Sequence, residues 1–199
     1  MRDIPRGFDR DPIRQFKRWY ADAVASGMKL PDAMALATAT RKGIPSVRMV
    51  LYRGINGDAF VFYTNYRSRK AVEIATNPRG ALVFHWPRLE RQVRIEGVIR
   101  KTTRREADQY FRSRPRESRL SAWASPQSSE IPDRTFVDSR FEELRRRYAG
   151  EEIPRPPFWG GYCLLPSRIE FWRGQPHRLH DRYCYVKKGR SWRAVVLAP

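Results

Sequence analysis

Cysteine, histidine and long apolar runs are scarce in this sequence, and each scarcity excludes a class of protein. The two cysteines, Cys163 and Cys184, fit no zinc spacing and lie in strand-like apolar segments, so we expect buried thiols and no disulfide. The three histidines, His85, His177 and His180, are too scattered along the chain to form a metal site. We therefore predict a protein without a bound metal.

No segment approaches the roughly 18 consecutive apolar residues that a membrane span requires. Residues 1–12 contain no apolar core of the signal-peptide type, so we expect a cytoplasmic protein. Hydrophobic residues make up 41% of the chain and aromatic residues 13%, which argues against general disorder. With no internal repeat or low-complexity segment, the 199 residues suffice for one domain with a proper core.

Acidic residues are strongly outnumbered, since 40 Lys and Arg against 21 Asp and Glu give a net charge of +19. Such an excess suits an anionic partner: nucleic acid, an acidic surface or a phosphorylated small molecule. Arginine dominates the excess, which favours planar, bidentate recognition of phosphate or carboxylate. The cations are spread along the chain, without a basic tail or a nucleic-acid-binding motif, so charge alone does not identify the partner.

The stretch from residue 48 to residue 70 organises the rest of the chain. Apolar and mixed residues alternate at its start, as in a half-buried strand whose apolar face carries Val47, Met49 and Leu51. Residues 55–58, Ile-Asn-Gly-Asp, supply a hairpin turn, because Asn-Gly accepts the positive φ angles of tight hairpins. A second strand, rich in aromatic residues, is predicted over 59–64.

A basic segment, Tyr66-Arg67-Ser68-Arg69-Lys70, then opens a helix that ends at Asn77-Pro78. A serine and three cations at a helix N-terminus suit a phosphate, because the free backbone N–H groups and the helix dipole point there and the cations add charge-assisted bonds. The alternative, which this stretch alone leaves open, is a solvated basic helix start.

Residues before this stretch predict a helix and a strand. The helix covers 11–25, with Asp11 as its N-cap, Pro12 at its first position and Gly27 beyond its end. The strand covers 33–40. We interpret 1–199 as one domain on which the N-terminal helical segment 1–30 packs.

Residues after this stretch predict two more strands. The run over 80–86 is nearly all apolar, as expected of a strand that is buried on both faces. The run over 91–101 predicts a long strand with Val93, Ile95 and Val98 facing inward and Gly97 at a bulge.

Three helices and several short strands complete the chain. Thr103-x-x-Glu106 is a capping box that opens the first helix, Pro115 interrupts it, and helical patterns follow over 117–124 and 132–148. Strands are predicted over 161–165, 168–172, 183–187 and 192–197. Meanders with helices inserted between them predict a mainly β protein of the α+β class, an antiparallel barrel with peripheral helices.

Three further segments carry side chains suited to chemistry. Gln92 interrupts the apolar pattern of a strand, although a solvent-facing glutamine would do the same. Tyr110, Arg114 and Ser118 follow at four-residue steps, which suits either a second phosphate site or an ordinary amphipathic helix. In the segment 171–182, which is rich in Gly, Gln and Pro, Arg178, His180 and Arg182 alternate and would share one face of a strand.

These pieces together resemble the pyridoxine/pyridoxamine 5′-phosphate oxidase family. From about Thr38 to Pro199 the matching segments are, in order, RMVLYRG, FYTNYRSRK, LVFHWPRLERQVRIEG, YFRSRPRESRLSAWASPQSS, WGGYCLLPSRIEFWRGQPHRLHDR and the terminal LAP. The resemblance implies a split-barrel fold that binds FMN and a homodimer with each flavin at the subunit interface. It also implies an oxidase that converts pyridoxamine or pyridoxine 5′-phosphate to pyridoxal 5′-phosphate, with O2 as the acceptor and H2O2 as a product.

Carried over by position, the resemblance implies a set of ligand contacts. The FMN contacts would be Arg48, Met49, Val50, Leu51, Tyr63, Thr64, Arg69, Lys70, Gln92, Gln127, Ser128, Trp172 and Arg182. The substrate phosphate would be bound by Arg53, Tyr110, Arg114 and Ser118, while Arg178 and His180 cover the pyridine ring as the catalytic residues.

Two departures from the family pattern leave the substrate open. Arg53 stands where the family usually has a lysine, and the short segment before the first helix lacks the basic and tyrosine residues that often close over the substrate. Flavin oxidases of phenazine biosynthesis share much of the pattern and act on larger, tricyclic substrates. A non-catalytic flavin-binding or nucleic-acid-binding protein is the alternative of another class, although the aromatic residues occupy core-like strand positions and form no exposed stacking platform.

Overall fold

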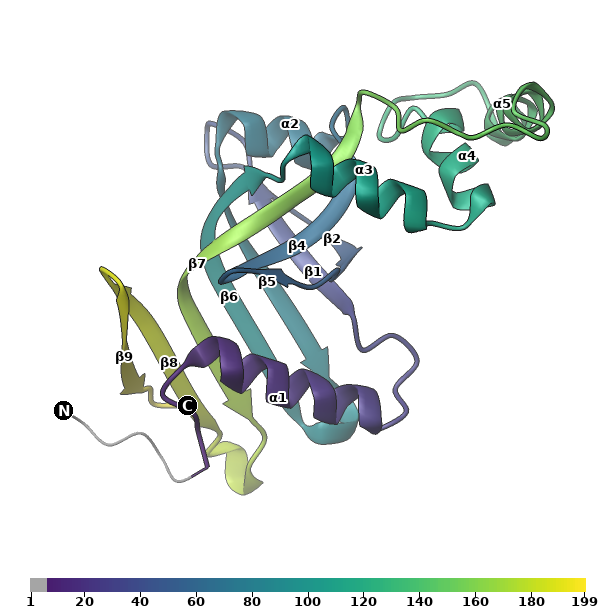
Figure 1. Ribbon diagram of the computed structural model, residues 1–199. Coiled ribbons are helices and arrows are strands. Elements are labelled where there is room, and N and C mark those ends of the chain that lie inside the picture. The colour runs from purple at the N-terminus through teal and green to yellow at the C-terminus, as the bar shows by residue number, and fades with distance from the viewer. Residues whose placement is uncertain (1–6) are drawn as a thin grey trace.

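The computed structural model describes residues 7–199, which form one antiparallel sheet of nine strands with five α-helices around it (Figure 1). The strand order is β2-β1-β5-β6-β7-β4-β3, with β8 paired to β7 and β9 paired to β8. The strands are β1 (Ala33–Ala39), β2 (Pro45–Leu51), β3 (Ile55–Asn56), β4 (Ala59–Asn65), β5 (Arg79–Trp86), β6 (Arg91–Lys101), β7 (Trp159–Arg173), β8 (Asp181–Lys188) and β9 (Ser191–Val196). The prediction of a mainly β, antiparallel architecture with peripheral helices is confirmed.

The sheet curls until its two ends approach each other. Directly after β2, the Arg53 N–H donates a hydrogen bond to the Val61 carbonyl of β4 at 2.8 Å, and the Val61 N–H donates to the Gly54 carbonyl at 2.9 Å. The long β7 joins the two halves of the curl, because its first residues pair with β4 and its last residues pair with β8. The curl gives the sheet an inner face, and this face carries the main core.

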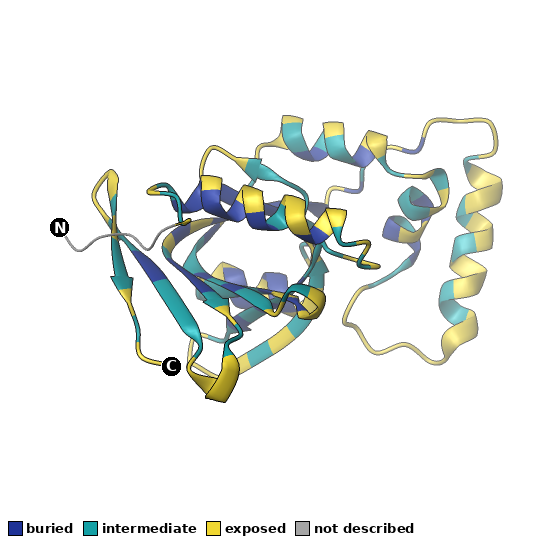
Figure 2. Ribbon diagram, turned by 90° about the horizontal axis from the view of Figure 1, so that it is seen from below, coloured by how far each residue is buried: buried dark blue, intermediate teal, exposed yellow. Residues whose placement is uncertain are grey.

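The first helix, α1 (Pro12–Ala25), packs its apolar side onto that core (Figure 2). Asp11 caps it as predicted, since its carboxylate accepts a hydrogen bond from the Ile13 N–H at 2.8 Å. Phe16 is fully buried, and its ring centroid lies 4.8 Å from that of Phe60 and 4.9 Å from that of Phe84. Burying a side chain of this size stabilises the fold by about 1.5–3 kcal/mol. Residues 1–6, part of the segment in which no signal-peptide core is predicted, lie outside the described residues.

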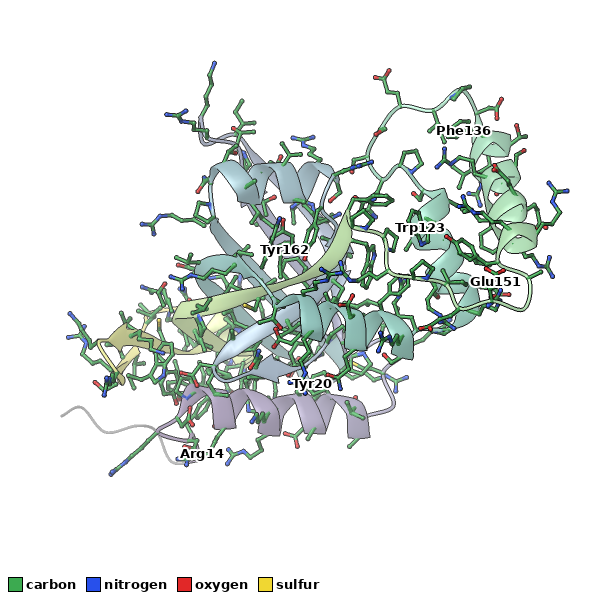
Figure 3. The ribbon with its side chains drawn as sticks, turned by 45° about the horizontal axis from the view of Figure 1, so that its top comes forward. Arg14, Tyr20, Trp123, Phe136, Glu151 and Tyr162 are labelled. Atoms are coloured by element: carbon green, nitrogen blue, oxygen red, sulfur yellow. The ribbon has the colours of Figure 1, made fainter. Side chains whose placement is uncertain are left out.

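A second, smaller core holds the helices that follow β6. These helices are α3 (Arg104–Ser113), which opens with the predicted capping box, α4 (Arg116–Ala124) and α5 (Arg134–Arg147). Phe111, Leu120 and Trp159 are buried among them, whereas α5 contains no buried residue. Figure 3 places Phe136 of α5 at the outer edge of this lobe, farther from the sheet than Trp123 of α4. The lobe therefore stands beside the sheet, with α5 as its outermost helix.

For two strands, the prediction of which faces are buried is wrong. On β2, Val47 and Met49 are 68% and 63% exposed, so the apolar face is the outer one in this chain. On β5, only Leu82, Phe84 and Trp86 are buried, and the opposite face is half-buried or exposed. A strand's own pattern shows that its faces differ but does not say which neighbour covers each face.

The bulge predicted at Gly97 is confirmed, but its extra residue belongs to the neighbouring strand. Glu96 pairs with Arg168 and Gly97 pairs with Pro166, so Ser167 of β7 is the residue without a partner. The alternation of β6 is therefore unchanged, and Ile99 is buried in place of the predicted Val98. β7 continues through the bulge as one strand where the sequence predicts two.

Two sequence-based predictions concern the environment of the chain. Cys163 and Cys184 are free thiols as predicted, the first half-buried and the second buried. The helices formed by residues 7–199 include none that is long and apolar enough to cross a membrane. The cytoplasmic location stays a prediction.

Candidate active site

A cavity of about 950 Å³ lies between the sheet and the helical lobe. Its walls come from β2, β4, the start of β7, the N-terminus of α2 (Arg69–Thr76), α3, α4 and the loop that follows α4. It is lined by Ser46, Val47, Arg48, Met49, Val50, Leu51, Arg53, Tyr63, Thr64, Asn65, Arg69, Lys70, Tyr110, Ser113, Arg114, Pro115, Ser118, Ser121, Ala122, Ser125, Gln127, Ser128 and Trp159. The lining is rich in hydroxyl groups and cations and includes no carboxylate.

Lys70 brings a buried positive charge to the α2 end of this cavity. Its Nζ donates to Thr64 Oγ1 at 3.1 Å, to Ser68 Oγ at 3.2 Å and to Gln127 Oε1 at 3.1 Å, all of them neutral acceptors. Burial, followed by the nearby charge of Arg48, lowers the pKa of Lys70 to about 8. The Ser68 hydroxyl donates to the Asn65 carbonyl and so leaves the first turn of α2 without a side-chain cap. This end of the cavity suits an anion.

Glu73 is buried and holds two of the lining arginines. Its Oε1 accepts from Arg69 Nε at 2.9 Å, and its Oε2 accepts from Arg48 Nη2 at 3.3 Å. Oε2 also accepts from the hydroxyls of Thr38 at 2.5 Å and Ser46 at 2.6 Å. Burial alone would raise the pKa of this carboxyl, but these hydrogen bonds and the Arg48 charge lower it to about 2. Glu73 is therefore a carboxylate at any ordinary pH.

The side of the cavity next to α3 combines an aromatic wall with a second cation, Arg114, which forms no ion pair within residues 7–199. The ring of Tyr110 stacks on Tyr63 with centroids 3.8 Å apart, and Tyr63 stacks on Trp159 at 5.6 Å. The Arg114 guanidinium carbon lies 4.6 Å from the Trp159 ring centroid. Arg114 Nη1 is buried and has no hydrogen-bond partner within residues 7–199. Burial lowers the pKa of Arg114, so an anion placed here would recover lost solvation.

Arg53 lies beside Tyr110 and, unlike Arg114, has a counter-ion among the described residues. Its Nη1 donates to Asp32 Oδ2 at 2.5 Å, and its Nε donates to the Tyr110 hydroxyl at 2.7 Å. Burial would lower the pKa of Arg53, but Asp32 and Tyr110 together raise it. Arg53 thus holds the Tyr110 hydroxyl in place and carries a charge that Asp32 balances.

The structure divides the sequence-predicted site residues into two groups. The first group lines the cavity: Arg48, Met49, Val50, Leu51, Arg53, Tyr63, Thr64, Arg69, Lys70, Tyr110, Arg114, Ser118, Gln127 and Ser128. Tyr110, Arg114 and Ser118 come together there even though the helix breaks between α3 and α4. The second group, Gln92, Trp172, Arg178, His180 and Arg182, does not line it.

Residues of the second group lie around the start of β6, the end of β7 and the start of β8, which are neighbours in the sheet (Figure 1). Gln92 pairs with Trp172, and Trp172 pairs with Arg182, across three adjacent strands. Arg182 Nε donates to the buried Glu170 at 2.8 Å, and the His180 ring lies 4.6 Å from that of Trp172. Within one chain, these side chains therefore lie apart from the cavity.

The prediction that Arg178, His180 and Arg182 share one strand face is wrong. Only Arg182 belongs to β8, because Arg178 ends the 3₁₀ turn η2 (Pro176–Arg178) and His180 precedes the strand. His177 and Arg178 have φ angles of 58° and 61°, a left-handed backbone that no strand contains. Arg178 is exposed, while His180 Nδ1 accepts a hydrogen bond from the Gln175 N–H at 3.2 Å.

Sequence reasoning missed three residues that shape the cavity. Glu73 follows Arg69 at the i, i+4 spacing of a helical ion pair, which is a usable signal. Asp32 and Trp159 contact the cavity residues only because distant segments meet, and no local pattern marks them.

Comparison with known proteins identifies relatives along the whole chain. A family model described as "Pyridoxamine 5'-phosphate oxidase" matches residues 20–148, and one described as "Pyridoxine 5'-phosphate oxidase C-terminal dimerisation region" matches residues 159–199. A pyridoxine/pyridoxamine 5'-phosphate oxidase of Rubrobacter xylanophilus is 54% identical over 97% of this chain and 89% of its own length. A relative of the same name from Anaeromyxobacter dehalogenans is 51% identical over 98% of this chain and 99% of its own length.

Solved structures share the fold. The crystal structure of PhzG from Burkholderia lata 383, in complex with tetrahydrophenazine-1-carboxylic acid, matches with a TM-score of 0.92 and 32% identity over 99% of this chain and 98% of its own. An FMN-binding protein from Nostoc punctiforme that is related to pyridoxamine 5'-phosphate oxidase matches with a TM-score of 0.77 at 20% identity. The curled sheet described above is therefore the split-barrel fold of these flavoproteins.

Proposed function

Because this chain belongs to the pyridoxamine 5'-phosphate oxidase family, an FMN-linked group of oxidases, we propose that it oxidises pyridoxamine or pyridoxine 5′-phosphate to pyridoxal 5′-phosphate. In this proposal O2 is the electron acceptor and is reduced to H2O2. Oxidation of the amine also consumes water and releases ammonia. FMN is the cofactor, and the donors that line the cavity fit it.

One observation carries the proposal: the cavity is lined by two cations, the buried Lys70 and the half-buried Arg114, and neither forms an ion pair within residues 7–199. Lys70 contacts only neutral acceptors, and Arg114 has a buried N–H donor with no partner in the described part of the chain. A buried charge is costly unless it is paired, so each position favours a bound anion. FMN and the substrate each carry one phosphate.

We assign the FMN phosphate to the α2 end. Arg69 and Lys70 begin that helix, where the free N–H groups and the helix dipole add to their charge. We assign the substrate phosphate to Arg114, with the hydroxyls of Tyr110 and Ser118 and the guanidinium of Arg53 beside it. Tyr63, Tyr110 and Trp159 then supply a rigid aromatic wall that excludes water from the ring-binding part of the cavity.

When bound, FMN supplies the hydride-accepting chemistry at the substrate carbon that carries the amine or the alcohol. The chain's residues orient the two rings and bind their phosphates, and the proposal requires no protein nucleophile. Arg178 and His180 would cover the pyridine ring, the arginine acting as an orienting and electrostatic group.

The active form in this proposal is a homodimer with FMN at the interface. The dimerisation region of the family, residues 159–199, contains four of the five second-group residues: Trp172, Arg178, His180 and Arg182. Val47 and Met49, which line the cavity, also expose an apolar face that a second chain would cover. We therefore propose that the second group of the partner subunit completes the cavity of the first chain.

A second candidate function rests on the similarity to PhzG, whose structure contains a tricyclic carboxylic acid. A carboxylate also satisfies an arginine such as Arg114, and Arg53 departs from the lysine of the usual pattern. Peroxide release by the FMN-loaded protein separates the two functions. Pyridoxamine 5′-phosphate should support turnover, whereas unphosphorylated pyridoxamine and a reduced phenazine carboxylic acid should not. Turnover of the tricyclic acid alone would favour the second function.

A further inference from the structure

Among the cations proposed to hold the FMN phosphate, Arg69 depends most on a neighbour for its position. Its side chain is 63% exposed, and its only hydrogen bond within residues 7–199 joins Nε to Glu73 Oε1 at 2.9 Å. Both terminal nitrogens of the guanidinium are left for a ligand. A long side chain on the surface loses much rotamer entropy when it binds, unless it is held beforehand.

Glu73 is itself fixed to the sheet by its other oxygen. Oε2 accepts from Thr38 of β1 and from Ser46 and Arg48 of β2, and the carboxylate is only 4% exposed. Arg48 in turn donates to the hydroxyls of Thr38 and Ser46 and to the Leu36 carbonyl. One oxygen is therefore anchored by three donors from the strands, and the other faces Arg69. Figure 1 shows α2, which carries Glu73, lying over the ends of these strands.

We infer that Glu73 is a positioning residue: it transmits the rigidity of β1 and β2 to Arg69 and so preorganises Arg69 for the FMN phosphate. The inference rests on the proposed placement of that phosphate at the start of α2. If Glu73 were only a counter-ion, its removal would increase the affinity for FMN, because removing a negative charge from an anion site strengthens anion binding.

Glu73→Gln separates these roles. With its NH2 group toward Arg69, the amide loses the bond from Arg69 Nε. With its NH2 group toward the strands, it meets the Arg48 donor and offers Arg69 only a neutral oxygen, which binds a guanidinium more weakly than a carboxylate does. Either way, Arg69 is held less firmly. We expect the FMN dissociation constant of the apoprotein, measured by flavin fluorescence, to rise about three- to tenfold, the cost of immobilising one long side chain. The dissociation constant of riboflavin, which lacks the phosphate, should change by less than about twofold. Glu142→Gln removes the same charge from exposed α5 and should alter neither.

Coupling to Arg69 is the second readout. If Glu73 acts through Arg69, then Glu73→Gln should weaken FMN no further in an Arg69→Ala background. Additive losses, equal losses for FMN and riboflavin, tighter FMN binding or no change would each overturn the inference.

Should Glu73→Gln fail to fold, Glu73→Asp provides a second test. It keeps the charge but its shorter side chain cannot reach both partners, so it should give the same FMN-selective loss. A wild-type protein with no preference for FMN over riboflavin would instead contradict the phosphate placement in the proposed function.

Discussion

At the scale of single residues, Lys70 links cofactor affinity to pH. Its pKa of about 8 in the folded protein lies below the usual 10.5, so the amine is charged below pH 8 and neutral above it. FMN affinity should therefore fall as pH rises past about 8, by up to about tenfold per pH unit. The free energy of unfolding of the ligand-free protein should instead rise between pH 8 and 10.5, because in this range Lys70 is protonated mainly in the unfolded state.

Titration of the apoprotein with FMN between pH 7 and 9.5 checks this expectation. Lys70→Arg provides the control, since a guanidinium stays charged across the range and should abolish the inflection. A wild-type dissociation constant that is flat across the range would remove Lys70 from phosphate binding.

Arg114 should control substrate binding without controlling the cofactor. Replacing it in Arg114→Met removes a charge-assisted bond worth about 1.5–3 kcal/mol, so KM for pyridoxamine 5′-phosphate should rise roughly 10- to 100-fold. Because the phosphate is bound equally in the ground and transition states, kcat should change little. Arg112→Met, which removes a 72% exposed cation from α3, two residues before Arg114, is the matched control. Loss of FMN from Arg114→Met would show that the two phosphates are assigned the wrong way round.

At the scale of elements, the sequence predicts where segments begin and end better than it predicts what covers them. Asp11, the Thr103 capping box and Pro115 act within one or two turns of helix, and the observed helix ends follow them closely. The exposed apolar face of β2 and the buried Ile99 depend instead on neighbouring strands.

The same distinction applies to the site. The basic start of α2 can be found from local sequence, and the resemblance supplies Tyr110, Arg114 and Ser118 as one set. The Glu73 network exists because β1, β2 and α2 meet, which no local pattern encodes. The turn at His177 and Arg178 has left-handed backbone angles at non-glycine residues, so alternation alone predicts a strand there.

The contact between α1 and the sheet should dominate the contribution of that helix to stability. Phe16→Ala leaves a cavity among Phe60, Phe84 and Trp86, and we expect it to lower the free energy of unfolding by about 3–5 kcal/mol. The neighbouring Lys17→Ala, at an exposed position, should change it by less than about 0.5 kcal/mol. Urea denaturation followed by circular dichroism measures both. Equal effects would mean that α1 is not packed as described.

At the scale of the whole molecule, the division of the site residues into two groups predicts complementation between chains. In an assay with pyridoxamine 5′-phosphate far below the wild-type KM, Arg114→Ala should be nearly inactive because its KM is raised, and Arg178→Ala because its flavin reduction is slow. After unfolding and refolding as an equal mixture, about half of the dimers would be mixed, and each mixed dimer would contain one intact site. Activity should then recover to about a quarter of the wild-type value. No recovery, with mixed dimers present by native mass spectrometry, would mean that one chain supplies both groups.

In the proposed function, this chain oxidises a phosphorylated B6 vitamer with its flavin. The most direct measurement mixes the FMN-loaded protein with pyridoxamine 5′-phosphate in the absence of oxygen and records the visible absorption of the flavin. We predict that the yellow colour bleaches and returns when air is admitted, with one pyridoxal 5′-phosphate formed per flavin. A protein that stays yellow with both pyridoxamine and pyridoxine 5′-phosphate, yet bleaches with a reduced phenazine carboxylic acid, would contradict the proposed substrate while leaving the fold and the cofactor in place.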